Sequence, residues 1–187
     1  GAAANSEALS RLRQAGFPRS RPTERIFWGI PTRLFKPMDK LALRKVLRLE
    51  YEHIVGYVGR LVPEKGLTWL LAAMKRLPRN VHCLIIGNGP LRGEIELWSE
   101  LPSLVGRVHL LDAQPVGDLP SYLNCMDVLA VPSLTTMDWE EQYGRVIAEA
   151  MACGVPVVGS DSGAIPEVID SAGFIVPEGD VAQLAEA

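Results

Sequence analysis

The chain has 187 residues, of which 48% are hydrophobic, and its formal net charge is −3. This length and composition predict one globular domain with a hydrophobic core. The charge argues against a nucleic-acid-binding surface, which would show clustered lysines and arginines and a basic isoelectric point. No apolar run approaches the ~20 residues that span a bilayer, and no signal segment opens the chain, so we expect a soluble, cytoplasmic protein.

The first 50 residues differ in composition from the rest. They lean basic and are rich in proline, which favours a solvated surface or a linker over a groove binder. Residues 7–16 predict a helix that ends at Gly16, and residues 26–37 predict a short strand followed by a proline-bounded linker. The chain begins without methionine and ends in a helical pattern without a cap. We therefore expect it to be a piece of a longer protein.

From residue 53 onward, apolar runs alternate with amphipathic segments. The apolar runs predict strands at 53–59, 81–87, 107–111, 127–131, 155–160 and 173–177. The amphipathic segments predict helices at roughly 66–77, 90–100, 118–125, 142–152 and 163–169, and from 180 onward. The strands are nearly continuous in Val, Ile and Leu, which is typical of strands buried on both faces of a parallel sheet. We therefore predict an α/β, doubly wound, Rossmann-like fold whose mostly parallel sheet has helices on both faces.

Cysteine and histidine are the usual ligands of structural and catalytic metals. The chain has three of each: Cys83, Cys125 and Cys153, and His53, His82 and His109. The cysteines lie far apart among apolar residues, which predicts buried thiols in a reducing compartment. The histidines have no partner at metal-ligand spacing, so we interpret them as structural and predict no metal site.

Ligands of a doubly wound sheet bind in the loops beyond the carboxyl ends of its strands. The first strand leads into "GRLVPEKG", where Gly59 permits a tight turn and Arg60 and Lys65 precede a helix. Two cations beside a helix N-terminus can bind a diphosphate. A solvated loop, in which Glu64 pairs with either cation, explains the same residues, and this segment alone does not separate the two interpretations.

The second strand leads into "GNGPLRG", which invites comparison with the dinucleotide motif G-x-G-x-x-G. After Gly87 and Gly89, the sixth position of that motif is occupied by Arg92, and the glycine comes one residue late. The motif also belongs after the first strand of such a fold. A tight turn, in which Gly89 lets the backbone approach a ligand, explains the loop better than a nicotinamide site.

The fourth strand is followed by a long polar loop from Pro132 to about Glu141. Such loops at the carboxyl edge are usually functional. The next helix is predicted to hold Gly144 in its first turn and Glu149 two turns beyond Glu141. Glu141 is either a helix-dipole acid or a ligand of hydroxyl groups, and Glu149 either pairs with a basic side chain or binds hydroxyls.

Three segments together resemble the family-4 retaining glycosyltransferases of GT-B architecture. They are "GRLVPEKG" (59–66), "IIGNGP" (85–90) and "EQYGRVIAEAMACGVPVVGSDSGAIPEVI" (141–169). The resemblance covers residues 53–187, and it implies that they form the nucleotide-sugar (donor) binding domain, the C-terminal half of that architecture, truncated at its C-terminus. Residues 1–50 would be the end of a mostly absent N-terminal acceptor domain, together with the interdomain linker.

The resemblance also assigns roles to individual residues. Arg60 and Lys65 would neutralise the leaving diphosphate, Glu141 would contact the transferred sugar, and Glu149 would hold the ribose hydroxyls. The remaining donor-binding residues would be Gly59, Gly89, Tyr143, Gly144, Arg145 and Val146. Gln142 and Tyr143 replace the glycine and phenylalanine of many relatives, which puts the donor preference in doubt more than donor binding.

The implied activity is transfer of a hexose from a nucleoside-diphosphate sugar with retention at the anomeric carbon, without a cofactor or an obligatory metal, as in polysaccharide or glycolipid biosynthesis. The implied partners are the donor and the chain's own N-terminal domain, and a membrane surface could be reached only through that domain. The isolated fragment is expected to be inactive. Alternatives are an epimerase or a glycogen- or sucrose-type synthase of the same architecture, a non-catalytic nucleotide-binding module, and a nicotinamide dehydrogenase. The donor base, the donor sugar, the acceptor and the oligomeric state stay open.

Overall fold

A six-stranded, all-parallel sheet forms the centre of the computed structural model, which describes residues 2–3, 5–18, 20–26 and 28–187. In spatial order its strands are β5 (Val108–Leu111), β4 (Val81–Ile86), β3 (His53–Val58), β6 (Val128–Val131), β7 (Val157–Ser160) and β8 (Phe174–Val176). The chain starts in the middle at β3, builds outward through β4 and β5, and returns to the other side of β3 with β6. This order confirms the predicted doubly wound, Rossmann-like fold and places its topological switch point between β3 and β6.

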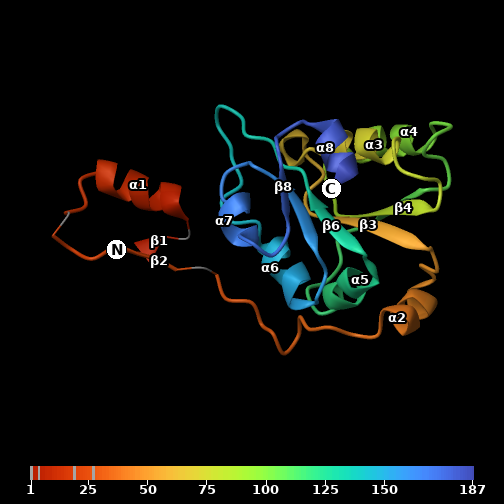
Figure 1. Cartoon of the computed structure of the whole chain (residues 1–187), viewed down its shortest axis with the longest axis horizontal. Helices are drawn as coiled ribbons and strands as arrows, with labels where there is room; N and C mark the ends of the chain where they lie inside the picture. The colour runs from red at the N-terminus through yellow and green to blue at the C-terminus, as the bar shows by residue number, and fades with distance from the viewer. Residues whose placement is uncertain (1, 4, 19, 27) are drawn as a thin grey trace.

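Helices cover both faces of this sheet (Figure 1). One face carries α3 (Leu67–Met74), α4 (Arg92–Ser99) and α8 (Val181–Glu186), and the other carries α2 (Lys40–Leu47), α5 (Leu119–Cys125), α6 (Arg145–Ala152) and α7 (Ile165–Ile169). Because successive strand side chains point to opposite faces, Ile54 packs in the α5–α6–α7 core, whereas Tyr57 packs in the α3–α4 core. The three cysteines are buried free thiols, as predicted.

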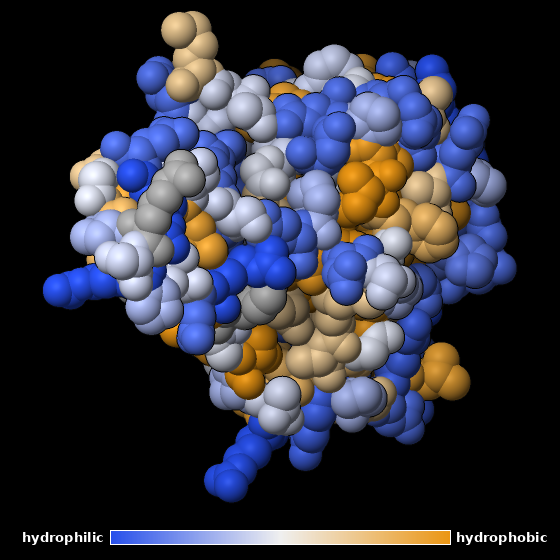
Figure 2. Space-filling model, turned by 60° about the vertical axis from the view of Figure 1, so that its left-hand side comes forward, coloured by the Kyte–Doolittle hydropathy of each residue, from blue (hydrophilic) through white to orange (hydrophobic). Residues whose placement is uncertain are grey.

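The N-terminal segment projects from the domain at the left of Figure 1. It consists of α1 (Ser6–Gln14) and a two-residue strand β1 (Ala2–Ala3), which pairs with β2 (Glu24–Arg25) in parallel. The face from which it projects carries hydrophilic and hydrophobic side chains side by side (Figure 2). Ile26 and Trp28, which follow β2, are 58% and 61% exposed, so apolar surface lies next to this segment.

The structure differs from the sequence predictions in three places. The strand predicted within 26–37 is wrong, because residues 26 and 28–37 form turns and irregular chain whose prolines lack an N–H donor for a sheet. Helix α2 was not predicted; Asp39 caps it by accepting a hydrogen bond from the Ala42 N–H at 3.0 Å. The helix expected from 142 begins at Arg145, because Gly144 adopts a left-handed conformation (φ 67°) that ends helical continuity.

Two of the histidines form a cluster at the amino-terminal ends of the strands. His82 of β4 and His109 of β5 share a hydrogen bond between Nδ1 and Nε2 at 3.0 Å. The Tyr51 ring stacks on both, with ring centroids 4.1 and 4.3 Å away. Burial lowers the pKa of both histidines, and the positive charge of Arg107 lowers the pKa of His82 further. This geometry supports the structural role predicted for them.

Acidification is expected to destabilise the fold through this cluster. Because the folded-state pKa values lie below the ordinary value, the unfolded chain binds more protons as the pH falls through about 6.5. The free energy of unfolding therefore decreases from neutral to mildly acidic pH. Urea unfolding at neutral and at mildly acidic pH should show a smaller decrease in the free energy of unfolding for His109→Phe, because the phenylalanine ring can stack on Tyr51 but cannot titrate. The exposed His53 supplies the control, because an equal effect of His53→Gln would contradict this assignment.

In the part of the chain that the structure describes, no helix has the length and apolar character needed to cross a membrane.

Candidate functional site

A cavity of about 270 Å³ opens at the carboxyl ends of β3 and β6, at the switch point of the sheet. The ends of these two strands form its floor, and the loops that follow them form its walls. Its lining residues are Tyr57, Val58, Gly59, Arg60, Lys65, Leu119, Ala130, Val131, Ser133, Glu141, Gly144, Arg145, Val146 and Glu149. Most of the predicted site residues, which are scattered over 90 positions of the sequence, therefore meet in one place.

A second cavity of about 310 Å³ adjoins the first. The two share Val58, Gly59, Arg60 and Leu119. The second cavity extends along the carboxyl ends of β3 and β4 and is closed by Asn88, Ala113 and Gln114. The two cavities together form one cleft, with Lys65 in the first cavity and Gln114 in the second. Two chemically different parts of one ligand could therefore occupy it, a charged group near Lys65 and a planar ring near Gln114.

Lys65 and Glu141 form the central ion pair of the cavity. Lys65 ends a short 3₁₀ turn, η1 (Pro63–Lys65), and its Nζ donates to Glu141 Oε2 at 2.5 Å. The two side chains are only 17% and 11% exposed. Ser133 Oγ lies 3.4 Å from the same carboxylate oxygen, and Lys65 Nζ lies 4.7 Å from the centre of the Trp139 ring. The ammonium is therefore oriented by both a carboxylate and an aromatic face.

Arg60 occupies a more open position at the edge of the cavity. Its guanidinium lies 3.6 Å from Glu64 Oε1, and its side chain is 64% exposed. Glu64 therefore pairs with one of the two cations, as one interpretation of this loop predicted, and both cations line the cavity. Their binding of a diphosphate stays a prediction. An exposed ion pair is worth little, so Arg60 can exchange Glu64 for an anionic ligand at small cost.

Glu149 is a buried acid whose charge costs stability. It lies on α6, is 4% exposed, and accepts from the Arg145 guanidinium at 2.9 Å one turn earlier. Burial raises the pKa of Glu149, and the nearby Arg145 offsets part of this increase. Because Arg145 is itself 61% exposed, the carboxylate is held at the cavity wall by a partner that can yield to a ligand.

The start of α6 also faces the cavity. Gly144 has no side chain with which to cap the helix. Within the first turn the Ile147 N–H donates to the Gly144 carbonyl oxygen at 2.8 Å, which leaves the N–H groups of Arg145 and Val146 for an anion. A Cβ at Gly144 would lie 2.7 Å from Ile147 Cδ1, and φ is positive. Glycine is therefore required here by the conformation of the backbone itself.

Two predicted site residues lie outside the cavity lining. A Cβ at Gly89 would lie 2.4 Å from the Leu61 carbonyl oxygen, so this glycine serves the contact between two loops. Tyr143 points toward the N-terminal segment, where its hydroxyl donates to the Trp28 carbonyl oxygen at 2.9 Å. Their roles toward a ligand stay predictions.

Sequence reasoning missed Tyr57, Ser133 and Trp139. Tyr57 and Ser133 line the cavity, and Trp139 contacts Lys65. A signal existed for Ser133: the buried strand ends at Val131, and Ser133 is the first polar residue after it, separated from the strand by one proline. Among the described residues, no three His, Cys, Asp or Glu side chains gather as a metal site would require; a reaction without an obligatory metal stays a prediction.

Comparison with protein families identifies the chain. The family described as glycosyl transferases group 1 matches residues 52–187, which is most of the sequence. The chain belongs to the group 1 glycosyltransferases. Its similarity to curated members extends over 149 residues at 35% identity for the D-inositol 3-phosphate glycosyltransferase of Segniliparus rotundus, which is 75% of this chain and 32% of that protein. The enzyme of the same name from Mycobacterium tuberculosis is 34% identical over 169 residues, 85% of this chain and 34% of that protein. The chain thus spans about a third of these relatives.

Two solved structures share the fold of this chain. HepE of Anabaena, in complex with UDP and glucose, matches with a TM-score of 0.83 and 29% identity over 99% of this chain and 51% of its own. Sucrose-phosphate synthase of Thermosynechococcus elongatus gives 0.82 and 30%, over 100% of this chain and 47% of its own. This group 1 glycosyltransferase chain is therefore the C-terminal, donor-binding half of a GT-B fold, as the sequence resemblance implied.

Proposed function

We propose that the full-length protein transfers a hexose from a nucleoside-diphosphate sugar to an acceptor with retention of anomeric configuration. The observation that carries the proposal is the cavity at the switch point, which combines Lys65, Arg60 and the start of α6 with the carboxylates of Glu141 and Glu149. Cations and helix N–H groups suit a diphosphate, and carboxylates suit the hydroxyls of sugars. Residues outside this chain would supply most of the acceptor site.

Each side of the cavity has a defined part in this reaction. Negative charge develops on the diphosphate as the bond to the sugar breaks, and Lys65, Arg60 and the α6 N–H groups stabilise it. Glu141 accepts hydrogen bonds from the transferred sugar, and Glu149 accepts them from the ribose. These roles need no cofactor and no obligatory metal, because the charge is neutralised by the protein's own cations and dipoles.

Similarity favours UDP as the nucleotide of the donor. HepE, 29% identical to this chain, has been solved with UDP-glucose bound. The match to sucrose-phosphate synthase supports a second candidate, a synthase of the same architecture, which would use the same donor cleft and differ in the acceptor. The acceptor would be bound mainly by the N-terminal domain, so we expect this chain alone to bind donor and to transfer nothing.

Titration calorimetry of this chain with UDP, GDP, ADP and NAD tests donor binding. We expect UDP to bind and NAD not to bind. We expect Arg60→Ala to weaken UDP binding by about tenfold and Glu149→Ala by about 10- to 100-fold, the range for loss of hydrogen bonds to a charged group. Arg92→Ala is the matched control, since Arg92 also bridges carboxylates, Glu96 and Asp112, but lies outside both cavities. Binding of NAD in place of a nucleoside diphosphate, by a chain shown to be folded, would contradict the proposal.

A further inference from the structure

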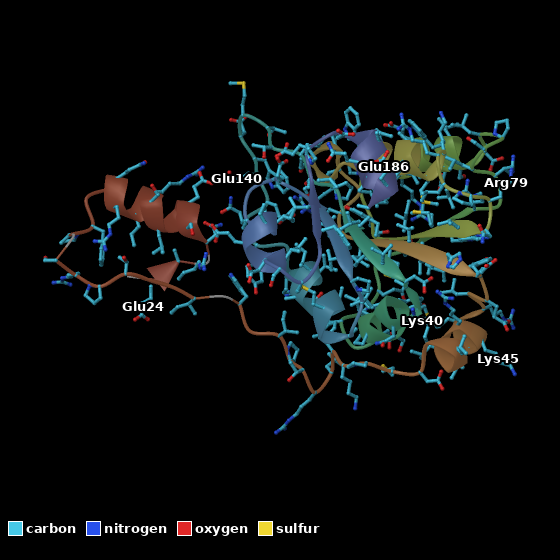
Figure 3. All side chains as sticks on the ribbon, viewed as in Figure 1. Glu24, Lys40, Lys45, Arg79, Glu140 and Glu186 are labelled. Atoms are coloured by element: carbon cyan, nitrogen blue, oxygen red, sulfur yellow. The ribbon has the colours of Figure 1, made fainter. Side chains whose placement is uncertain are left out.

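Residues 139–143, which contain Glu141, are contacted from two sides. On the cavity side, Lys65 contacts both the Trp139 ring and the Glu141 carboxylate. The residues between and after them contact the N-terminal segment instead. Glu140, labelled in Figure 3, lies where α1 meets the domain, and its carboxylate is 3.3 Å from the Arg11 guanidinium. The segment 139–143 therefore lies between the candidate active site and residues from the start of the chain.

Asn5 makes the most buried of these N-terminal contacts. Its side-chain Nδ2 donates to the Gln142 carbonyl oxygen at 2.7 Å, and its Oδ1 accepts from the Ala8 N–H at 2.7 Å. The residue is 5% exposed. A single amide group thus caps α1 and holds the carbonyl of Gln142, the residue after Glu141.

Two other contacts hold segment 139–143, one weak and one strong. The Arg11–Glu140 pair is exposed, with the Arg11 side chain 67% accessible, and such pairs contribute little. The Glu141 carbonyl oxygen accepts from the Ala164 N–H at 2.8 Å, which anchors it to the start of α7. The two successive carbonyls are thus held by different parts of the protein, that of Glu141 by the domain and that of Gln142 by Asn5, so the two peptides that follow the Glu141 Cα are both held.

We propose that Asn5 is a positioning residue for Glu141 and, through the Glu141–Lys65 pair, for the diphosphate-binding lysine. This inference rests on the proposed function, and it adds a link from the N-terminal segment to the reacting centre. When the Asn5 amide is lost, the Gln142 carbonyl oxygen loses its hydrogen bond, and segment 139–143 keeps the exposed Arg11–Glu140 pair and the Tyr143–Trp28 hydrogen bond on that side. The backbone around Glu141 is then held less tightly, and its carboxylate no longer meets the transferred sugar in one fixed geometry. A catalytic side chain displaced by about 1 Å can slow a reaction by about 100-fold.

Asn5→Ser and Asn5→Asp in the full-length protein separate this link from the capping of α1. Both side chains can still cap the helix, but neither donates to the Gln142 carbonyl oxygen as the amide does. We expect turnover of UDP-glucose, measured as its hydrolysis to UDP and glucose, to fall roughly tenfold to hundredfold in both variants. The Kd for UDP should change much less than turnover, because Glu149 and α6 are not displaced and UDP carries no transferred sugar for Glu141 to contact. Hydrogen exchange of the amides in 139–143 should become faster.

Ser6→Ala is the matched control, because Ser6 is the next residue and its hydroxyl accepts from Arg25 at 3.3 Å without touching 139–143. Unchanged exchange in 139–143, or turnover as slow in Ser6→Ala as in Asn5→Ser, would overturn the inference. If the wild-type protein neither binds UDP nor hydrolyses UDP-glucose, the proposed function fails for this donor. Hydrogen exchange, which needs no substrate, then decides by itself whether Asn5 holds the segment.

Discussion

Lys65→Met is expected to lower turnover of the full-length enzyme by on the order of 10²-fold or more, the usual effect of removing one well-placed group that stabilises developing charge. Lys65 is the cation closest to Glu141, and it is oriented by that carboxylate and by the Trp139 ring. Methionine keeps the length of the side chain and its packing but carries no charge. The loss should appear mainly in kcat, because the charge on the diphosphate grows as the bond to the sugar breaks.

The chain offers a close control for this substitution. Lys75 also places its ammonium over an indole ring, 5.7 Å from the centre of Trp98, but it lies at the end of α3 and outside the donor cavity. Lys75→Met should leave kcat and KM unchanged. If Lys65→Met folds, binds UDP and retains full turnover, the ion pair with Glu141 is structural, and the assignment of the developing diphosphate charge to Lys65 is wrong.

Much of the fold was predictable because burial on both faces of the sheet leaves a strong pattern. The strands β3 and β4 read as nearly continuous apolar runs, each with one histidine near its start, since neither face of a central strand meets water. Strands with this pattern run parallel, so their carboxyl ends meet at one edge of the sheet, and the loops that follow them could be placed there. The sequence therefore predicted that Arg60, Lys65, Glu141 and Glu149 would meet, before their distances were known.

Local patterns did not predict the contacts between distant residues. Lys65 and Glu141 are 76 positions apart, and no periodicity relates an ammonium to the carboxylate that it will contact. The start of α6 was misplaced because the amphipathic pattern extends through Gly144, and that pattern does not reveal the positive φ of this glycine. Asn5 carries no motif, and its role depends on where the N-terminal segment folds back onto residue 142.

Glu149 is an acid at a buried position, where its charge lowers the free energy of unfolding. Its folded-state pKa is raised by burial, so between about pH 4.5 and that raised value the folded state binds more protons than the unfolded state. The free energy of unfolding contributed by this group consequently falls as the pH rises through that window, and at neutral pH the ionised carboxylate is a net cost. A residue that packs α6 alone would not need a charge at this position.

Glu149→Gln is therefore expected to raise the Tm of this chain at pH 7 while weakening UDP binding by about 10- to 100-fold, the range for hydrogen bonds to a charged group. Glutamine keeps an oxygen that can accept from Arg145, so the packing of α6 is preserved. Thermal unfolding at pH 7 and at about pH 4.5 should show that the difference from wild type shrinks in acid, where Glu149 itself becomes neutral. Glu94→Gln, on the exposed side of α4, should change neither quantity. A variant that is less stable at pH 7 and still binds UDP normally would show that Glu149 is a structural partner of Arg145, and the assignment of the ribose to this carboxylate would then be wrong.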